Sequence, residues 1–458
     1  MENQEISDSA EPATVQAEAS TENGSENGSV EKASRLVLGI ETSCDETGAA
    51  VVSTDGRVLG EALASSAAIH AQWGGVVPAL AKGEHEKAID GVVDLALSNA
   101  GVSASDLSAI AVTIGPGLSL CLRLGAMKAR ELARQHRTPL ISVHHMEAHA
   151  LVARLTNDGV NFPFLTLLVS GGHNLLLLAH SVGHYTQLGT TLDDALGEAY
   201  DKTARLLGLD LSKGGGPALE ALAREGDPQR FKFSVPMRAS KTGSKTCDFS
   251  YAGLKTNVRL AIESEIPGAE QRPLADVDAT ERQLRADIAA SFQRVAVAHL
   301  EERTRRAIGW ALEQEPNIKC LVMAGGVAAN KYVRESLTRA VQEGPLELTR
   351  REVKLGMKRK EYTPIRLVCP PPRLCTDNGV MVAWAGVERL RLGLEEPPPP
   401  LEETDHSNVQ LRPRWPMGEI HSKSTTGVGS IRATRAFPSL TAFTKSMSTS
   451  AQPAASVL

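Results

Sequence analysis

The chain uses one order of elements twice, and this repetition restricts the possible folds more than any other feature. RLVLGIETSCDETGAAVVST (35–54) reads as strand, polar turn, strand, and FPFLTLLVSGGHNLLLLAHS (162–181) follows the same plan. A strand, a glycine-rich turn and a helix come later in each half, first in AIAVTIGPGLSLCLRLGAMKARELA (109–133) and then in IKCLVMAGGVAANKYVRESLTRAV (318–341). Short β-rich runs that alternate with longer helical runs are typical of α/β proteins. We therefore expect two lobes of like topology.

Four polar or glycine-rich turns would then surround one cleft between the lobes. Backbone N–H groups at such turns and at helix starts suit phosphate groups. This is the plan of the actin, Hsp70 and sugar-kinase (ASKHA) superfamily, an inference by analogy at the level of the fold. We assign residues 35–158 to the first lobe and 159–416 to the second, whose final helix is free to return to the first.

Both ends of the chain are expected to be disordered. Residues 1–34 hold eight acidic residues and one basic residue among Ser, Asn and Gly, and residues 417–458 are rich in Ser and Thr without a regular pattern. Transit peptides are rich in Arg and poor in acids, so the N-terminal segment does not indicate an organelle. The apolar stretch 162–180 is interrupted by Ser-Gly-Gly-His-Asn, and we expect no transmembrane helix.

Charge and cysteine content exclude other classes of protein. The six cysteines lie far apart without a CxxC pair, which favours reduced thiols over a zinc ribbon or a thioredoxin-like site. The net charge of -5 does not indicate nucleic-acid binding by itself, but a local basic patch would suffice for it. The run from Arg350 to Lys360 has six basic residues and one acid, and it either contacts RNA or forms a solvated loop.

Three histidines and a glutamate lie within six residues in SVHHMEAHAL (142–151). His145 and His149 are spaced i,i+4, so on a helix both rings project from one face and can share a cation. The alternative is a pair of solvated or capping histidines. The protease signature H-E-x-x-H has its glutamate directly after the first histidine, whereas Glu147 lies two residues on, so a protease would lack its base.

Other carboxylates stand where they could complete a site. Asp377 precedes an apolar helix in LCTDNGVMVAWAG, where it is either a third metal ligand or part of a helix cap with its neighbours. Asp45 and Glu46 lie in a turn between two strands, where carboxylates can orient a nucleophile, a water or a cation. An ordinary hairpin turn explains this pair equally well.

Residues that suit a nucleotide are spread over four motifs. The two glycines of LVSGGHN (168–174) either let backbone approach a ligand or form a tight hairpin. AGGVAAN places Asn330 near a helix start, and GEAYDKTARLLGL sets Asp201 on the polar face of a helix. GGGPALE puts Gly216 before a helix start and Glu220 one turn inside it. Taken singly, each is also compatible with an ordinary solvated position.

Seven motifs in order give a far more specific pattern: GIETSCDETG, HHMEAH, LVSGGH, GEAYDKTARLLGL, DFSYAGLKT, MAGGVAANK and CTDNGVMVAWAG. Together they resemble the family of tRNA N6-adenosine threonylcarbamoyltransferases, formerly named O-sialoglycoprotein endopeptidases, over about residues 35–416. The ending RPRWP and the form VSGGH resemble its bacterial and mitochondrial branch. The resemblance implies transfer of a threonylcarbamoyl group from L-threonylcarbamoyladenylate to adenosine in tRNAs that read ANN codons, with release of AMP.

The resemblance also implies roles for individual residues. His145, His149 and Asp377 would hold one divalent metal ion, iron or zinc, and Asp45 and Glu46 are candidates for positioning or deprotonating the attacking amine. The residues that would cradle the adenylate are Leu168, Val169, Ser170, Gly171, Gly172, Asp201, Gly216, Glu220 and Asn330. The chain departs from the family pattern at Asn174, where Thr is usual, and in a longer loop before Gly216.

The branch carries expectations about partners and compartment. It implies tRNA and L-threonylcarbamoyladenylate as substrates and a homodimer as in mitochondrial relatives, or accessory subunits as in bacteria, with no membrane. The expected compartment is the mitochondrion, with cytoplasm or plastid as alternatives. The rival functions are an ASKHA-type small-molecule kinase, a noncatalytic scaffold and a metallopeptidase.

Overall fold

The computed structural model describes residues 34–71, 73, 75–212, 214–240, 243–354, 362, 364–402, 409–424 and 438–450. The acidic segment expected to be disordered lies outside the described residues except for Ser34. Residues 355–360 of the basic run also lie outside them, so the expected RNA contact there stays a prediction.

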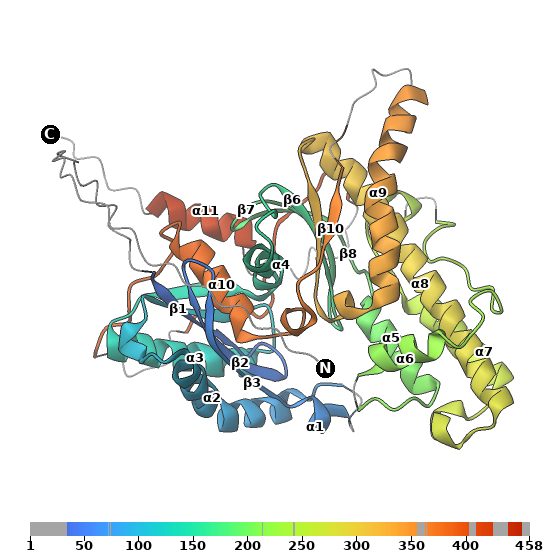
Figure 1. Ribbon diagram of the computed structural model, residues 1–458, viewed down its shortest axis with the longest axis horizontal. Coiled ribbons are helices and arrows are strands. Elements are labelled where there is room, and N and C mark those ends of the chain that lie inside the picture. The colour runs from blue at the N-terminus through green and yellow to red at the C-terminus, as the bar shows by residue number, and fades with distance from the viewer. Residues whose placement is uncertain are drawn as a thin grey trace, which may run out of the picture. The chain divides into compact units, whose positions relative to one another are not determined.

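Two sheets with the same strand order form the framework (Figure 1). The first has the order β3-β2-β1-β4-β5 and is built from β1 (Leu36–Glu41), β2 (Glu46–Ser53), β3 (Val58–Ser65), β4 (Ala109–Gly115) and β5 (Leu140–His144). The second has the order β8-β7-β6-β9-β10 and contains β6 (Phe164–Val169), β7 (Asn174–Ser181), β8 (His184–Thr190), β9 (Cys320–Ala324) and β10 (Arg366–Val368). In both, the first three strands of the lobe are antiparallel and the last two join in parallel. The duplicated ASKHA fold is thus confirmed.

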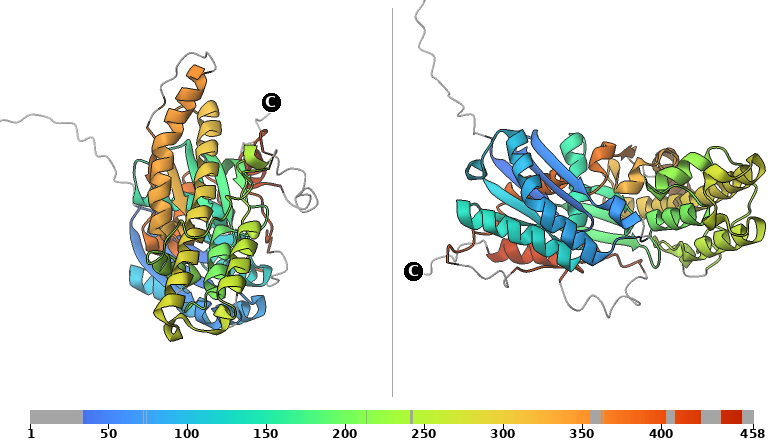
Figure 2. Two further views of the ribbon diagram at one scale, coloured as in Figure 1. Left: turned by 90° about the vertical axis from the view of Figure 1, so that its right-hand side faces the viewer. Right: turned by 90° about the horizontal axis from the view of Figure 1, so that it is seen from below.

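Helices cover the sheets because the central strands are apolar on both faces. The first half contributes α1 (Ala67–Ala71), α2 (Pro78–Ala100), α3 (Ser119–His136) and α4 (His145–Thr156). The second half contributes α5 (Leu196–Leu206), α6 (Gly215–Ala223), α7 (Ala252–Glu265), α8 (Ala279–Gln314), α9 (Lys331–Lys354), α10 (Gly379–Leu390) and α11 (Leu440–Ser450). Figure 2 shows α2 beside α3 and α8 beside α9.

Helix α10 lies on the first sheet although it follows the strands of the second. The helices α2 and α3 cover the face that carries Leu38 and Ile40, and α10 packs against the opposite face. Glycines allow this close approach: a Cβ added to Gly39 would lie 2.1 Å from the backbone nitrogen of Ala383, and one added to Gly379 would lie 2.3 Å from the carbonyl carbon of Ala49. The first sheet is therefore covered by segments from both ends of the fold.

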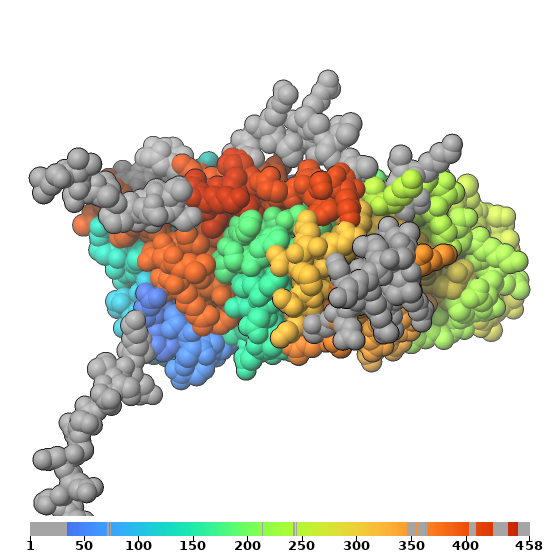
Figure 3. Space-filling view, turned by 90° about the horizontal axis from the view of Figure 1, so that it is seen from above, coloured from blue at the N-terminus to red at the C-terminus, as the bar shows by residue number. Residues whose placement is uncertain are grey.

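The described residues beyond 416, which are 417–424 and 438–450, differ from the expectation that the segment 417–458 would be disordered. Strand β11 (Glu419–Ile420) extends the second sheet beside β8, and α11 packs on the same strand. In Figure 3 the red atoms of α11 lie beside green atoms of the second sheet. Leu440 is fully buried, and the Thr441 hydroxyl oxygen accepts a hydrogen bond from the Tyr185 nitrogen at 3.0 Å. Few apolar residues suffice here because the edge of a sheet offers unpaired backbone groups. No helix among the described residues has the length and apolar character needed to cross a membrane.

Candidate functional site

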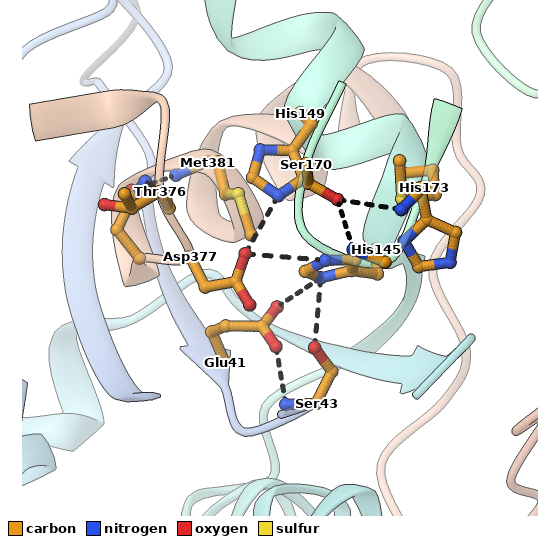
Figure 4. A network of polar contacts seen from close by, with 12 residues as sticks. Glu41, Ser43, His145, His149, Ser170, His173, Thr376, Asp377 and Met381 are labelled. Atoms are coloured by element: carbon orange, nitrogen blue, oxygen red, sulfur yellow. Dashed lines mark hydrogen bonds and ion pairs between the residues drawn. The ribbon is translucent and has the colours of Figure 1, made fainter. Parts of the chain in front are cut away.

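Helix α4 presents His145 and His149 side by side. Its N-cap is His144, whose Nδ1 accepts from the Met146 nitrogen at 3.1 Å and whose Nε2 donates to the Trp415 carbonyl at 3.0 Å. Burial lowers the pKa of His144 to about 3, so this ring is neutral and structural. One turn of helix separates His145 from His149, and their ring centroids lie 4.8 Å apart (Figure 4).

Asp377 reaches this pair from the segment that leads into α10. Its Oδ1 lies 3.0 Å from Nε2 of His149 and 3.5 Å from Nε2 of His145. The helix cap is supplied instead by Asn378, whose Oδ1 accepts from the Met381 nitrogen at 2.9 Å. Asp377 is therefore not needed as a cap, and one potential ligand atom from each of the three side chains lies within 4.8 Å of the others.

Glu41, at the end of β1, orients the first histidine and was missed by sequence reasoning. Its Oε2 lies 3.3 Å from Nδ1 of His145, and the Ser43 hydroxyl lies 3.1 Å from the same nitrogen. The fully buried carboxylate also accepts from the Ser43 nitrogen and the Thr113 hydroxyl, both at 2.6 Å. Burial alone would raise the pKa of Glu41, but His145 outweighs it and lowers that pKa. A carboxylate behind a histidine is the usual second layer of a metal site.

The donor set fits a transition-metal ion. With Nδ1 of His145 held by Glu41 and Ser43, its Nε2 is left to face Asp377, and two imidazoles with one carboxylate suit zinc or iron. Nδ1 of His149 is buried without a hydrogen-bond partner, and Nε2 points to Asp377. Without a cation, burial lowers the pKa of His145, but Asp377 and Glu41 raise it to about 9 overall. The concentrated negative charge thus attracts a cation to this point.

Glu46 is the first residue of β2 and lies near enough to Asp377 for their charges to interact, and Asp45 directly precedes it. The Ser65 hydroxyl donates to Oε1 of Glu46 at 3.2 Å, and the Asp45 carbonyl accepts from the Ser66 hydroxyl at 2.8 Å. Burial, followed by the charges of Asp45 and Asp377, raises the pKa of Glu46 to about 9. A carboxyl group with a pKa this high carries a proton at neutral pH and can exchange it with a substrate.

The glycine turn contributes backbone rather than side chains. Leu168 and Val169 lie inside β6 with fully buried side chains, so of the segment expected to contact adenylate only Ser170 to Gly172 is accessible. The Ser170 hydroxyl oxygen accepts from the Gly172 nitrogen at 3.3 Å. A Cβ added to Gly171 or Gly172 would meet nothing, so the turn borders open space.

Helix α5 connects this turn with Asp201 and, through Asp201, with Gly216. The Gly197 nitrogen donates to the Ser170 carbonyl at 3.2 Å, which fixes the start of α5 against the turn. Farther along α5, burial raises the pKa of Asp201 although the carboxylate accepts from the nitrogens of Gly215 and Gly216. Gly216 is the second residue of α6 and not, as expected, a residue before that helix.

Two polar residues meet at the start of α9. Oε1 of Glu220 accepts from the Lys331 nitrogen at 2.9 Å, and Oδ1 of Asn330 accepts from the Val333 nitrogen at 2.9 Å. A Cβ added to Gly325 would lie 2.3 Å from the Val169 carbonyl oxygen, which brings the second glycine-rich turn against the first.

Glu147 has a structural task. It is fully buried, and its Oε1 accepts from the Gly183 nitrogen at 2.7 Å and from the Tyr185 hydroxyl at 3.0 Å. Its Oε2 pairs with Nη1 of Arg389 at 3.1 Å. This network ties α4 to the second sheet and to α10, and it occupies both carboxylate oxygens of Glu147, so Glu147 is not available as the base of a peptidase.

Comparisons with known proteins show which family the chain resembles. The family model for TsaD, tRNA N6-adenosine threonylcarbamoyltransferase, matches residues 57–384. A probable mitochondrial tRNA N6-adenosine threonylcarbamoyltransferase of Arabidopsis thaliana is 55% identical over 89% of this chain and 80% of its own length. The tRNA N6-adenosine threonylcarbamoyltransferase of Rhizobium etli is 44% identical over 86% of this chain and 97% of its own length.

A solved structure, component A of the (R)-2-hydroxyglutaryl-CoA dehydratase of Acidaminococcus fermentans, covers 78% of this chain and 99% of that chain with 14% identity and a TM-score of 0.41. The family model and the two sequence relatives favour neither a small-molecule kinase nor a peptidase. The chain belongs to the tRNA N6-adenosine threonylcarbamoyltransferase family.

Proposed function

We propose that the chain transfers the threonylcarbamoyl group of L-threonylcarbamoyladenylate to N6 of the adenosine beside the anticodon (adenosine-37) in tRNAs that read ANN codons. The observation that carries this proposal is the joint placement of a His-His-Asp cluster and an open glycine turn. His173 links the two, because it ends the turn and its ring lies close enough to the cluster to interact with it. Burial, followed by the charge of His145, lowers the pKa of His173 to about 4, and the charge of Asp377 acts in the opposite direction. A donor bound at the turn would present its reacting carbonyl to the cluster.

The adenylate would bind through backbone and carboxylates. Ser170 to Gly172 offer N–H groups and room for the nucleotide, while Asp201 and Glu220 can accept from ribose hydroxyls. Gly216 is also open, since a Cβ there would meet nothing. Asn330 lies at the start of α9, where the N–H groups favour an anion.

His145, His149 and Asp377 would hold one divalent ion, iron or zinc, and Glu41 would keep Nε2 of His145 directed at it. Such an ion supplies Lewis acidity to the carbonyl or phosphate oxygen of the donor. Since the histidines come from the first lobe and Asp377 from the second half of the chain, binding would also fix these segments relative to each other.

The transfer forms a bond between N6 of adenosine and the carbamoyl carbon and breaks the bond from that carbon to the phosphate oxygen, which leaves with AMP. Asp45 and Glu46 are our candidates for positioning the amine and taking up its proton. The support is the proximity of Glu46 to Asp377, which contributes to the raised pKa of Glu46, and the position of Asp45 directly before Glu46. Two adjacent carboxyl groups at this place could take up and relay the proton that the amine releases.

We propose that the chain acts in mitochondria, because the Arabidopsis relative is named as mitochondrial. We propose a homodimer as well, since this is what the resemblance to the mitochondrial branch implies. The alternatives are the cytoplasm or a plastid, and accessory subunits of the bacterial type. Size-exclusion chromatography with light scattering tests the dimer, and a fluorescent fusion of the full chain tests the compartment.

The test of the activity uses purified, metal-loaded protein, a tRNA transcript that reads an ANN codon and L-threonylcarbamoyladenylate, with nucleoside mass spectrometry as readout. The expected result is one threonylcarbamoyladenosine per tRNA, lost in His149→Ala and retained in a matched surface variant, His136→Ala. Asp45→Ala with undiminished transfer would remove that residue from the mechanism. No modified nucleoside from the wild-type protein, with or without bacterial accessory subunits, would refute the proposed function.

A further inference from the structure

A cavity of about 290 Å³ lies beside the candidate metal site and is used by none of the roles assigned so far. Its walls come from five parts of the chain: the loop after β4, the start of α4, the residues after the glycine turn, strand β8, and the segment that contains RPRWP. The residues that line the cavity include Pro116, Met146, His173, Leu175, Arg414 and Trp415.

The cavity adjoins the cluster through two residues. Met146 follows the expected ligand His145 directly on α4, and His173 ends the open glycine turn. Figure 4 shows His173 on the side of His145 that faces away from Asp377. A group held in the cavity would therefore approach the cluster from the side opposite Asp377.

The walls are largely apolar and one of them is rigid. Trp415 is nearly buried, and its ring is held by His144 at 4.8 Å and Phe443 at 5.5 Å between centroids. Pro116, Met146 and Leu175 supply further apolar surface. A rigid aromatic wall with flexible Met and compact Pro opposite is suited to the faces of a flat ring.

Few polar groups face this space. Gln187 from β8 and His173 can donate or accept, and the exposed Arg414 guanidinium stands at the cavity. Proteins that act on a nucleobase hold it between apolar or aromatic side chains, read its edge with a few hydrogen bonds, and contact the flanking phosphates with basic residues. The threonyl group of the donor is small and has no flat face to match such walls.

We infer that this cavity receives the adenine base of the acceptor nucleotide, turned out of the tRNA loop, with N6 directed toward the metal cluster and Arg414 against a neighbouring phosphate. This inference rests on the proposed function and adds the binding site of the second substrate. In this assignment the RPRWP segment recognises the acceptor nucleotide, and it has no role in binding the adenylate.

The experiment compares Leu175→Phe, which fills the cavity, and Arg414→Gln, which removes the cation, with the wild type. The acceptor is an anticodon stem-loop of a tRNA that reads an ANN codon. For Leu175→Phe we expect kcat/KM for the stem-loop to fall more than about tenfold, with KM for the donor and bound metal unchanged. For Arg414→Gln we expect a dissociation constant for the stem-loop raised about three- to tenfold and a salt slope reduced by about one.

Two variants of matched chemistry serve as controls away from the cavity: Leu392→Phe, at a residue 57% exposed, and Arg57→Gln, at an arginine in the β2–β3 turn. Both should behave as the wild type. Gln187→Leu, which changes an edge contact without adding bulk, replaces Leu175→Phe if that variant does not fold, with the same expected loss toward the stem-loop.

The outcomes distinguish failure of the cavity assignment from failure of the proposed function. A raised KM for the donor with normal stem-loop binding would assign the cavity to the threonyl group or to the donor's own adenine and overturn the inference. Normal stem-loop kinetics in Leu175→Phe and Arg414→Gln, in the presence of full wild-type transfer, would overturn it and leave the proposed function intact. If the wild type transfers nothing, the proposed function fails, and unchanged stem-loop affinity in both variants refutes the cavity assignment independently.

Discussion

Replacing Glu147 by Gln should destabilise the protein strongly, although the two side chains have the same shape. Gln keeps a carbonyl oxygen for the Gly183 nitrogen and the Tyr185 hydroxyl, which Oε1 of Glu147 accepts at 2.7 and 3.0 Å. On the other side it turns an amide toward Nη1 of Arg389, so two donors face each other. Arg389 is 1% exposed and would be left as a buried cation without its counter-ion.

The magnitude follows from the burial of both charges. Removing one partner of a buried ion pair costs about 3–5 kcal/mol, whereas removing both together is often neutral. We therefore expect Glu147→Gln to cost about 3 kcal/mol. Arg389→Met should cost less, because the carboxylate keeps two hydrogen bonds, and Glu147→Gln/Arg389→Met should recover most of the loss.

The assay is urea denaturation of metal-free protein at pH 7.5, followed by tryptophan fluorescence, since Trp384 and Arg389 lie on the same helix, α10. Arg154→Met/Glu388→Gln is a useful comparison, because this ion pair at 2.8 Å joins the same two helices but its arginine is 19% exposed. The reasoning is refuted if Glu147→Gln loses less than about 1 kcal/mol, the value of an ordinary hydrogen bond. A double variant less stable than Glu147→Gln would refute it as well.

Three further predictions concern the metal, pH and the C-terminal segment. Glu41→Gln should weaken metal binding about 10- to 100-fold, because it alters the acceptor of Nδ1–H of His145; competition with a chromophoric chelator measures this, and an unchanged affinity contradicts the role of Glu41. In metal-free protein the pKa of Glu46 is raised from 4.5 to about 9, so the protein releases a proton from this group on unfolding and its stability falls as pH rises between those values. Glu46→Gln should therefore raise the melting temperature at pH 8 and leave it unchanged at pH 4.5. An equal gain at both pH values would count against the raised pKa. Truncation after Ser424 removes α11 and should cost at least about 2 kcal/mol, since burial of one leucine such as Leu440 is worth about 1.5–3 kcal/mol; a truncated protein with an unchanged urea midpoint would show that α11 adds nothing.

The repeated pattern of elements was enough to predict the fold, because strand order in an α/β lobe follows from few connection rules. The i,i+4 spacing likewise placed His145 and His149 on one face of a helix. Asp377 and Asn378 show what the local sequence pattern cannot predict, which is the residue of the two that caps α10. Both are good caps, and only the tertiary position of α4 assigns the cap to Asn378 and directs Asp377 to the histidines.

Glu41 was overlooked for a related reason. In GIETSCDETG the turn position of Asp45 and Glu46 indicates candidate site residues, whereas the position of Glu41 indicates only the end of a buried strand. Its contact with His145 spans 104 residues and has no local signature. The expectation of disorder was wrong for the described parts of the C-terminal segment. Their composition suggests disorder, but an edge strand of the second sheet provides backbone groups and apolar surface that residues 417–424 and 440–447 bind.

The position of α10 bears on how the chain reaches its native state. The first sheet leaves the ribosome early, and α4 follows it soon after on the face that carries Val37. The part of this face over β1 and β2 gains its cover only with residues 379–390, more than 300 residues after Val37. Contacts between such distant residues slow folding and expose apolar surface in the meantime. We therefore expect nascent or truncated chains that end before Gly379 to bind chaperones and to be degraded rapidly, and the complete chain to acquire protease resistance in both halves at once.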